Sequence, residues 1–386
     1  MGTYMASAGV DSTAMIWSCK NTFVEMGKTE MEMRWCALKS LRGHFSEISD
    51  VAWSRDEKYL VTASIDNSSI LWNVEKSQQL QRFEGHKNYV SGVTVDPFFK
   101  YIITQSTDKT VKVMKNTESK TNVKFYLKNN IYKRRCLLDE EQKVAVFDKD
   151  DEDANDLSVY DSLEMQKEKK LTVFSHRMFL DDTEVFSFSR RLEFSPDGSF
   201  FIVPCGVYQT GPEKKDVFYV SYGFIRNNIS EPAFVLPSAG TCPLVIRFHP
   251  GLFERKEKDE PFVDLPYIMV FAIATQDQII VYTTRSQEPY AIIGNIHYAE
   301  LTDLSWSNDK LLASSRDGFV TLVSFDDQDL GTVLTKENIP DNVSHLFEYL
   351  DLESWKTKNN LNGEKNADIE QKVIQPTFTS RKNKVQ

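Results

Sequence analysis

The sequence predicts an all-β protein of the β-propeller class. Two stretches repeat the same order of features: a Gly-His pair, an alternating strand, a second strand that runs into an aspartate, and a third strand. His44 and His86 are 42 residues apart, and so are Asp66 and Asp108. A period of about 40–45 residues is that of a propeller blade with four strands. The 386 residues are enough for one large all-β domain of this kind.

The recurring residues have a mechanical explanation. An aspartate in a turn accepts hydrogen bonds from a nearby imidazole and from turn amides, so one buried network fixes the loop geometry. This is the WD-repeat pattern, and its two sets are His44, Ser64, Asp66 and Trp72, then His86, Ser106 and Asp108, with Met114 in place of the second tryptophan. A catalytic triad is the alternative interpretation, but an active site does not recur once per blade.

A shorter copy comes before these two. Tyr4 to Asp11, followed by TAMIW up to Trp17, matches the second and third strands of a blade, and the segment that begins at Trp35 supplies the fourth. Asp11 and Trp17 therefore take the aspartate and tryptophan positions of the network. We expect this blade to lack its opening strand.

Three degenerate blades are readable further along the chain. The first contains a Pro-Asp-Gly turn, which is typical of a hairpin, and the last lacks a closing strand. The predicted strands lie in Arg190–Gly206, Val217–Phe224 and Pro232–Pro237, then Pro243–Pro250, Pro266–Thr275, Gln278–Thr284 and Pro289–Gly294, then Leu301–Ser307, Leu311–Gly318 and Phe319–Phe325. The prediction is six readable blades within residues 1–326, with the first and the last incomplete.

Two segments fall outside the predicted blades. Residues 139–164 contain 11 acidic residues and two lysines. The simplest interpretation of such a charge block is a solvated loop inserted between blades. Residues 327–386 have a short amphipathic stretch at His345–Trp355 and are otherwise polar, so they are predicted to form a mostly disordered tail.

Composition excludes several classes of function. The formal net charge is −10, which argues against direct, sequence-specific nucleic-acid binding and is compatible with basic partners. The five cysteines form no CxxC pair, so neither a disulfide framework nor a zinc site is predicted, and a reducing compartment fits best. The sequence contains no apolar run long enough for a membrane span and no secretory signal.

Catalytic motifs are not found either. The sequence has no Gly-rich phosphate loop, nucleophile elbow or HExxH motif. His176 with Asp181 and Asp182 is the best candidate for a metal or acid–base site, although such a group is common by chance. We therefore expect no catalytic residue, no metal and no cofactor.

Several segments resemble the WD-repeat subunit of chromatin assembly factor 1, which is called the B subunit in animals and Cac2 in yeast. The resemblance runs from about Met5 to Gly331 and skips the acidic insertion. It is carried by LRGHFSEISDVAWS, VTASIDNSSILWNV, GHKNYVSGVTVDP, LPYIMVFAIATQDQIIVYTT and SSRDGFVTLVSFDDQDLG. The most specific parts are Arg190-Arg191-Leu192 ahead of SPDG and the run Asn295–Tyr298 ahead of LTDLSWS.

The resemblance implies a nuclear, non-enzymatic scaffold in a complex that deposits histones H3–H4 on newly replicated or repaired DNA. Its implied partners are the large subunit of chromatin assembly factor 1, the anti-silencing-function histone chaperone and, mostly through the complex, histones H3–H4. The acidic insertion then has the alternative role of attracting histones. The family's propeller has seven blades, closed by its amino-terminal strand, so we expect a truncated amino terminus that lacks roughly 60–80 residues.

Six residues are carried over as candidate partner-binding positions, and a role in holding the blades together is the alternative for each. They are Arg190, Arg191, Asn295, Ile296, His297 and Tyr298. Exposed arginines pair well with carboxylates, and Tyr298 or His297 is of a type that anchors binding pockets. The segment Thr379–Val385 matches the family's chaperone-binding motif only loosely, because the expected proline is missing.

Two other scaffold functions are alternatives. The sister family, histone regulator A, uses the same propeller for replication-independent deposition, and its chain continues into a long second domain. A generic adaptor, for example in ubiquitin ligation, is the other alternative.

Overall fold

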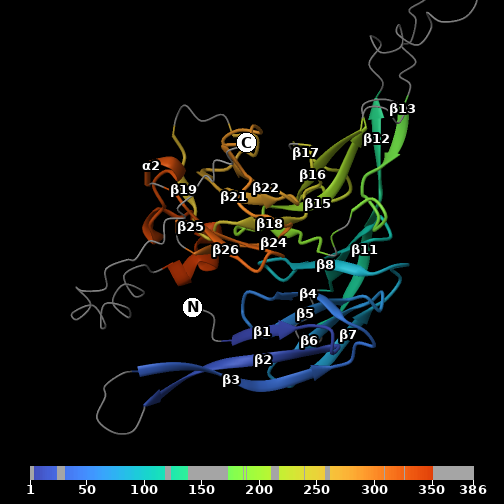
Figure 1. The fold of residues 1–386 in the computed structure, drawn as a ribbon, viewed down its shortest axis with the longest axis vertical. Coiled ribbons are helices and arrows are strands. Elements are labelled where there is room, and N and C mark those ends of the chain that lie inside the picture. Colours follow the sequence, from blue (N-terminus) through green and yellow to red (C-terminus); the bar gives the residue numbers. More distant parts are fainter. Residues whose placement is uncertain are drawn as a thin grey trace, which may run out of the picture.

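In the described residues, six antiparallel sheets of three or four strands follow one another around a common centre (Figure 1). The computed structural model describes residues 4–23, 31–117, 123–137, 173–185, 187, 189–209, 217–238, 240–256, 261–307, 309–325 and 327–350. Each sheet is one blade of three or four strands. The prediction of an all-β propeller with six readable blades is therefore confirmed.

The first three blades correspond to the sequence repeats. Blade 1 consists of β1 (Tyr4–Ala8), β2 (Thr13–Phe23) and β3 (Met31–Arg42). Blade 2 consists of β4 (Ile48–Trp53), β5 (Tyr59–Ser64), β6 (Ser69–Asn73) and β7 (Gln78–Phe83). Blade 3 consists of β8 (Val90–Val95), β9 (Tyr101–Ser106), β10 (Val111–Asn116) and β11 (Phe125–Ile131).

The last three blades follow the degenerate repeats. Blade 4 consists of β14 (Glu193–Phe194), β15 (Phe200–Gln209), β16 (Val217–Ile225) and β17 (Phe234–Pro237). Blade 5 consists of β18 (Val245–Phe248), β21 (Val270–Ala274), β22 (Gln278–Thr283) and β23 (Ala291–Gly294). Blade 6 consists of β24 (Leu301–Ser307), β25 (Lys310–Ser315) and β26 (Val320–Ser324).

Two ribbons lie outside the blades. β12 (Lys133–Leu137) pairs with β13 (Val173–Arg177), and this ribbon extends beyond β11 at the rim (Figure 1). β19 (Phe253–Glu254) pairs with β20 (Tyr267–Ile268) between β18 and β21. Each ribbon therefore lies next to a blade as a separate two-stranded sheet and adds no strand to the sheet of that blade.

The hydrophobic core consists of five clusters, and each of them lies between two neighbouring blades. Blades 1 and 2 share one cluster, and further clusters join blades 2 and 3, 3 and 4, 4 and 5, and 5 and 6. A single blade is too thin to bury its own faces, so it depends on its neighbours for a core. Stability is thus distributed around the ring and not concentrated in one centre.

The period-two pattern of the central strands explains how one strand serves two clusters. Along β21, Val270, Ala272 and Ala274 face blade 6, whereas Phe271 and Ile273 face blade 4. Successive side chains of a strand point to opposite faces of the sheet. Both faces of the central strands are therefore covered, and every residue of β8, β9 and β21 is buried.

Polar contacts also join the blades at their turns. Asp197, in the Pro-Asp-Gly turn of blade 4, accepts a hydrogen bond of 2.7 Å from the hydroxyl of Tyr267 in β20. Arg226, after β16 of blade 4, forms an ion pair with the buried Asp96 of blade 3. These contacts fix the rotation of blade 4 relative to both of its neighbours.

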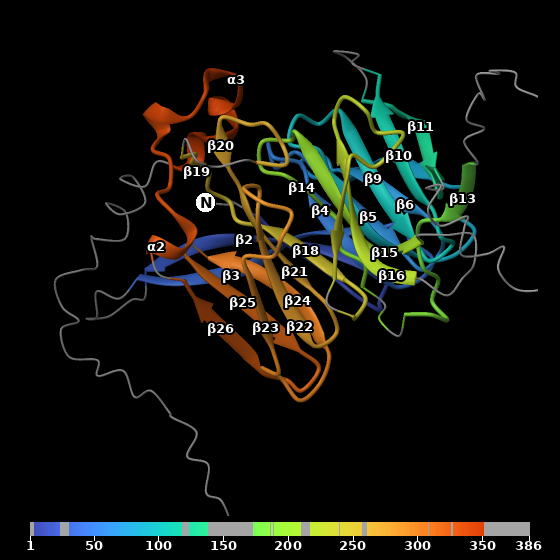
Figure 2. The ribbon, with the colours of Figure 1, turned by 90° about the horizontal axis from the view of Figure 1, so that it is seen from above.

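The segment after blade 6 corrects part of the sequence prediction. Its ordered elements are α2 (Asp327–Leu330), η1 (Lys336–Asn338), α3 (Asp341–Ser344) and η2 (His345–Leu350). Ile339, Val343, Leu346 and Phe347 pack into the cluster shared by blades 4 and 5, and α3 lies beside β19 and β20 (Figure 2). The expectation of disorder is therefore wrong for residues 327–350, because apolar side chains between Ile339 and Phe347 are buried against the propeller.

Other sequence predictions lie outside the described residues. These are the acidic insertion at 139–164 and the segment Thr379–Val385.

Replacement of Phe347 tests whether the carboxy-terminal helices belong to the folded unit. The side chain is fully buried, so Phe347→Ala is expected to lower the free energy of unfolding by about 3–5 kcal/mol. Urea denaturation followed by tryptophan fluorescence measures the change. Phe319→Ala is the matched control, because Phe319 is 67% exposed and its loss leaves no cavity. Equal stability of the two variants would contradict the packing described.

Candidate functional site

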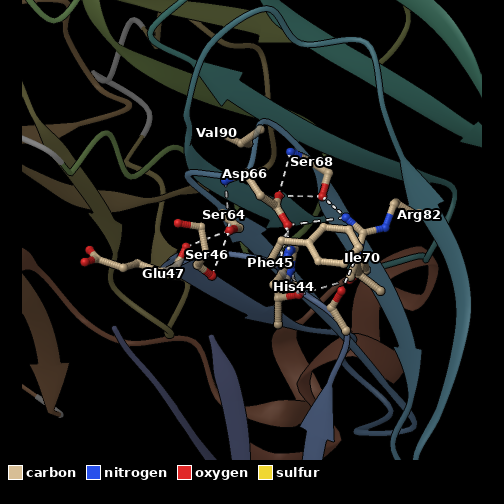
Figure 3. A network of polar contacts seen from close by, with 12 residues as sticks. His44, Phe45, Ser46, Glu47, Ser64, Asp66, Ser68, Ile70, Arg82 and Val90 are labelled. Atoms are coloured by element: carbon tan, nitrogen blue, oxygen red, sulfur yellow. Dashed lines mark hydrogen bonds and ion pairs between the residues drawn. The ribbon is translucent and has the colours of Figure 1, made fainter. Parts of the chain in front are cut away.

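The WD-repeat network of blade 2 is built on the turn that Asp66 occupies (Figure 3). The Oδ2 atom of Asp66 lies 2.9 Å from Nδ1 of His44 and accepts a hydrogen bond of 3.0 Å from the Phe45 amide. On its other side, Nε2 of His44 lies 2.7 Å from the Thr62 hydroxyl, which accepts a hydrogen bond of 2.9 Å from the Trp72 indole. This series of contacts from Trp72 through Thr62 and His44 to Asp66 thus connects β6, the third strand of blade 2, to the loop before β4.

The electrostatics fix the protonation of this network. Burial lowers the pKa of His44, against the opposing effect of Asp66, so the imidazole is held neutral. Burial alone would raise the pKa of Asp66, but hydrogen bonds from Ser68, the Phe45 amide and His44 outweigh it and hold this pKa far below its usual range. A neutral histidine with its Nδ1 proton directed to Asp66 leaves Nε2 to accept a hydrogen bond from Thr62.

Sequence reasoning placed Ser64 in this network, and the structure gives the serine a different task. Its hydroxyl donates a hydrogen bond of 2.7 Å to the Glu47 carbonyl and accepts one of 3.1 Å from the Asp66 amide. Ser64 therefore supports the turn, while the hydroxyl next to the imidazole belongs to Thr62. Ser106 supports the equivalent turn in blade 3, where it contacts the Asn88 carbonyl and the Asp108 amide.

A simple spacing signal would have found the missing hydroxyl. Thr62 lies four residues before the turn aspartate, and Trp72 lies six residues after it. The same two positions can be compared in blades 1, 2, 3 and 6, in that order. Four residues before the aspartate lie Ser7, Thr62, Thr104 and Ala313. Six residues after it lie Trp17, Trp72, Met114 and Val323. The network is therefore complete in blade 2 and progressively reduced in blades 3 and 6.

The other blades follow this spacing. In blade 3, His86 lies 3.0 Å from Asp108 and 2.9 Å from the Thr104 hydroxyl. In blade 1, the Trp17 indole donates a hydrogen bond of 2.8 Å to Ser7, and the carboxylate of Asp11 accepts one of 3.1 Å from the Thr13 amide.

The difference between blades 2 and 3 yields a quantitative prediction. Thr62→Val keeps the shape of the side chain but leaves both His44 and Trp72 without their partner. We expect it to lower the free energy of unfolding by about 2–4 kcal/mol. Thr104→Val leaves only His86 without its partner, since the side chain of Met114 has no N–H group, and it should lower the free energy of unfolding by roughly half as much. Thermal and urea denaturation of the two variants measure this; a larger loss for Thr104→Val would contradict the assignment.

The run Asn295–Tyr298, a candidate partner-binding segment, contains the network histidine of blade 6. Nδ1 of His297 lies 3.0 Å from Asp317, and the Tyr298 amide donates to the same carboxylate. Ile296 packs against the core cluster of blades 5 and 6, and Asn295 has a positive φ of 57° in the loop after β23. Only Tyr298, which is 95% exposed, and Asn295 present side chains to solvent.

Arg190 holds the fold together and is not on the surface. Its side chain is fully buried, and its guanidinium donates a hydrogen bond to the Leu180 carbonyl. The backbone here approaches β8 so closely that a Cβ atom at Gly92 would lie 1.8 Å from the Arg190 carbonyl oxygen. Only glycine permits such an approach. The hypothesis that Arg190 binds a partner is wrong, because no partner reaches a fully buried side chain.

Arg191 lies in a central ionic cluster, which we define as Asp50, Arg191, Arg247 and Asp303. It pairs with Asp303 of β24, and its Nε lies 3.8 Å from Asp50 of β4. Arg247 of β18 lies 3.0 Å from the same Asp303 carboxylate. These side chains come from blades 2, 4, 5 and 6. Arg191 therefore joins distant blades across the centre, which was the structural alternative for this residue.

Glu193 lies beside this cluster. Its carboxylate accepts a hydrogen bond of 2.7 Å from the Phe248 amide, which links β14 to β18. Burial raises the pKa of Glu193 to about 7, although Arg247 and the Phe248 amide favour the charged form. The carboxyl is thus protonated in the folded chain at pH values at which it is ionised in the unfolded chain.

This shift predicts a pH dependence of stability. A carboxyl whose pKa is raised on folding stabilises the fold below its unfolded value of 4.5, and this contribution is lost as the pH rises through about 7. Glu193→Gln keeps a neutral side chain at every pH. The wild-type chain should therefore lose stability relative to Glu193→Gln between these two pH values, as measured by the urea midpoint at a series of pH values. A constant difference would contradict the buried, neutral state of Glu193.

The candidate metal or acid–base group is not assembled. His176 lies on β13 with Nδ1 2.9 Å from the Arg177 carbonyl. Asp181 is held elsewhere, 2.7 Å from Lys109, and Asp182 is exposed. Over the described residues, no group of three or more potential ligands is placed to hold a metal ion, and no helix is long and apolar enough to cross a membrane.

The repeated sheets and their His–Asp turns define a WD-repeat β-propeller. A sequence profile described as the CAF1B/HIR1 beta-propeller domain matches residues 1–155 and 142–330. The chain therefore belongs to the CAF1B/HIR1 β-propeller family, a family of non-catalytic scaffolds.

Individual relatives agree with this assignment. The chain is 33% identical over 358 residues to the B subunit of chromatin assembly factor 1 from Mus musculus, covering 88% of this chain and 56% of the mouse protein. It is 33% identical over 333 residues to the chromatin assembly factor 1 subunit FAS2 homolog of Oryza sativa subsp. japonica, covering 86% and 59% of the two chains. Protein HIR1 of Yarrowia lipolytica is 26% identical over 378 residues, which cover 90% and 31%. The chain thus spans less than two thirds of the length of each of these relatives.

Proposed function

We propose that this chain is a non-enzymatic scaffold subunit of chromatin assembly factor 1. In this role it supports the deposition of histones H3–H4 onto DNA during replication and repair, in the nucleus. The observation that carries the proposal is the identity of 33% to the mouse chromatin assembly factor 1 protein over 88% of the chain. The 26% identity to HIR1 of Yarrowia lipolytica makes a histone regulator A-like complex the second candidate.

The structure is suited to such a role. A propeller is rigid because each blade is held by its neighbours, and its loops and strand edges are presented around the rim. In the WD-repeat turns, the residue after each network histidine projects outward, while its amide is fixed by the turn aspartate. Phe45 and Tyr298 are thus large exposed side chains on a fixed backbone, which is how interface anchors are presented.

The proposed partners are the large subunit of chromatin assembly factor 1 and the anti-silencing-function histone chaperone. Histones H3–H4 are proposed to be reached mostly through the complex. The net charge of −10 is compatible with a basic histone nearby and opposes direct contact with DNA. Tyr298 and Asn295 remain the proposed partner-binding side chains.

Co-precipitation tests the proposal. The tagged chain is expected to capture the large subunit of chromatin assembly factor 1 from the same organism. Tyr298→Ala should weaken this capture about tenfold or more, since an exposed aromatic anchor would be lost. Tyr126→Ala is the matched control, because Tyr126 is also exposed but lies on β11, away from the turns. Capture of histone regulator A partners in place of the large subunit would overturn the proposal.

A further inference from the structure

A cationic cavity lies where blade 3 meets the β12–β13 ribbon. Its volume is about 450 Å³, and it is lined by the β7–β8 loop, the β9–β10 turn and the ribbon. Five of its side chains are cationic, namely Lys87, Lys109, Lys112, Lys133 and Arg177, and among the described residues of the lining Asp108 is the only carboxylate. Such a concentration of positive charge is unexpected in a chain with a net charge of −10.

Most of this charge is not neutralised within the described part of the chain. Lys109 is the exception, because it lies 2.7 Å from Asp181 and 3.6 Å from Glu184. Asp108 is turned inward, where its oxygens accept hydrogen bonds from the Lys87 amide and the Thr110 hydroxyl and contact His86. Lys87, Lys112, Lys133 and Arg177 have no ion pair with any described carboxylate.

Lys112 is the most informative of these residues. Its side chain projects from β10 and is only 9% exposed, yet no described carboxylate lies within ion-pair distance of its amine. Burial lowers the pKa of Lys112, while the negative charge of Asp108, which lies beyond ion-pair distance, opposes this effect. The amine is positioned beside Gly85, where an added Cβ would lie 3.0 Å from Nζ. The amine of a largely buried side chain has lost part of its hydration, and an anion bound in the cavity would offset that loss.

The shape of the site favours an extended ligand. The cavity shares Asn130, Tyr132 and Lys133 with a second cavity of about 620 Å³, which continues past Arg134 to the segment after β16 of blade 4. That far end carries the exposed carboxylate of Glu231, so the cationic part of the groove lies between blade 3 and the ribbon. We call the two together the basic groove. Lys133 and Arg177 lie opposite each other in the β12–β13 register at its mouth, and the exposed ring of Tyr132 lies between the two cavities.

We propose that the basic groove binds a short acidic segment of a partner protein in an extended conformation. Its carboxylates would contact Lys112, Lys133 and Arg177, and its backbone would cross Tyr132. A nucleic acid fits the observations less well. A polyanion of that size requires a long basic track, whereas the groove is short and the whole chain is acidic.

The test is fluorescence anisotropy of the full chain with a labelled oligo-glutamate peptide. Binding is expected, and its affinity should fall as the salt concentration rises. Lys112→Met preserves the aliphatic stem and removes the charge, so it should weaken binding about tenfold. Lys133→Gln with Arg177→Gln changes only exposed side chains and should weaken binding at least as much, which keeps the test decisive if Lys112→Met perturbs folding.

The matched control is Lys76→Gln with Lys100→Gln, two exposed lysines outside the groove. It changes the net charge by the same two units, from −10 to −12, and should leave binding unchanged. Equal weakening by both double variants would show that binding depends only on the overall charge and would overturn the proposal.

Tighter binding of a single-stranded oligonucleotide of equal charge would overturn it in favour of a nucleic acid. Binding that arises only after residues 139–164 are replaced by a neutral linker would assign the groove to this chain's own acidic segment and would also overturn it.

Discussion

The mutual burial of neighbouring blades is the constraint on which the rest of this structure depends. Every core cluster joins two blades, and no blade contains a core of its own among the described residues. The central strands must therefore be buried on both faces, as β9 and β21 are. Buried polar side chains on these strands, such as Thr104 and Ser106 of β9, are hydrogen-bonded, and other polar groups lie at the turns, in the centre and at the rim. There they fix the geometry or remain free to contact other molecules.

The polar networks have distinct tasks in this arrangement. The His–Asp turns hold individual loops, and their completeness falls from blade 2 to blade 6 as the hydroxyl and the tryptophan are replaced. The central ionic cluster joins blades that are not neighbours, through Arg191 and Asp303. Replacement of a single turn residue thus affects one loop, whereas the central cluster couples several blades. Because these networks lie inside the propeller, a partner is left to contact the rim, the loops and the grooves.

Much of the fold could be predicted from the sequence, because the repeat period and the strand alternation are local signals. The spacing of His44 and His86 sufficed to identify the propeller, and the six blades followed from it. The helices of residues 327–350 could not be predicted, since their apolar residues are few and their order depends on a surface formed by blades 4 and 5. The role of Thr62 was missed because the serine next to the turn is the more conspicuous hydroxyl, although a threonine repeats four residues before the aspartate in blades 2 and 3.

The candidate site was less predictable than the fold. A family-specific residue is conspicuous in a sequence whether it is buried or exposed, and only coordinates distinguish the two cases. Arg190 and Arg191 proved to hold blades together, and His297 proved to be a turn histidine. The basic groove had no sequence signal, because its cations come from loops and strands distant in the sequence and meet only where the ribbon returns to blade 3.

Hydrogen exchange of backbone amides in the free chain tests the central claim most directly. If blades bury one another, the amides of β5, β9, β15 and β21 exchange slowest and at one common rate set by global unfolding, whereas the outer strands β7, β23 and β26 exchange faster. Central strands that exchange independently of one another, or as fast as the outer strands, would contradict a core shared between blades.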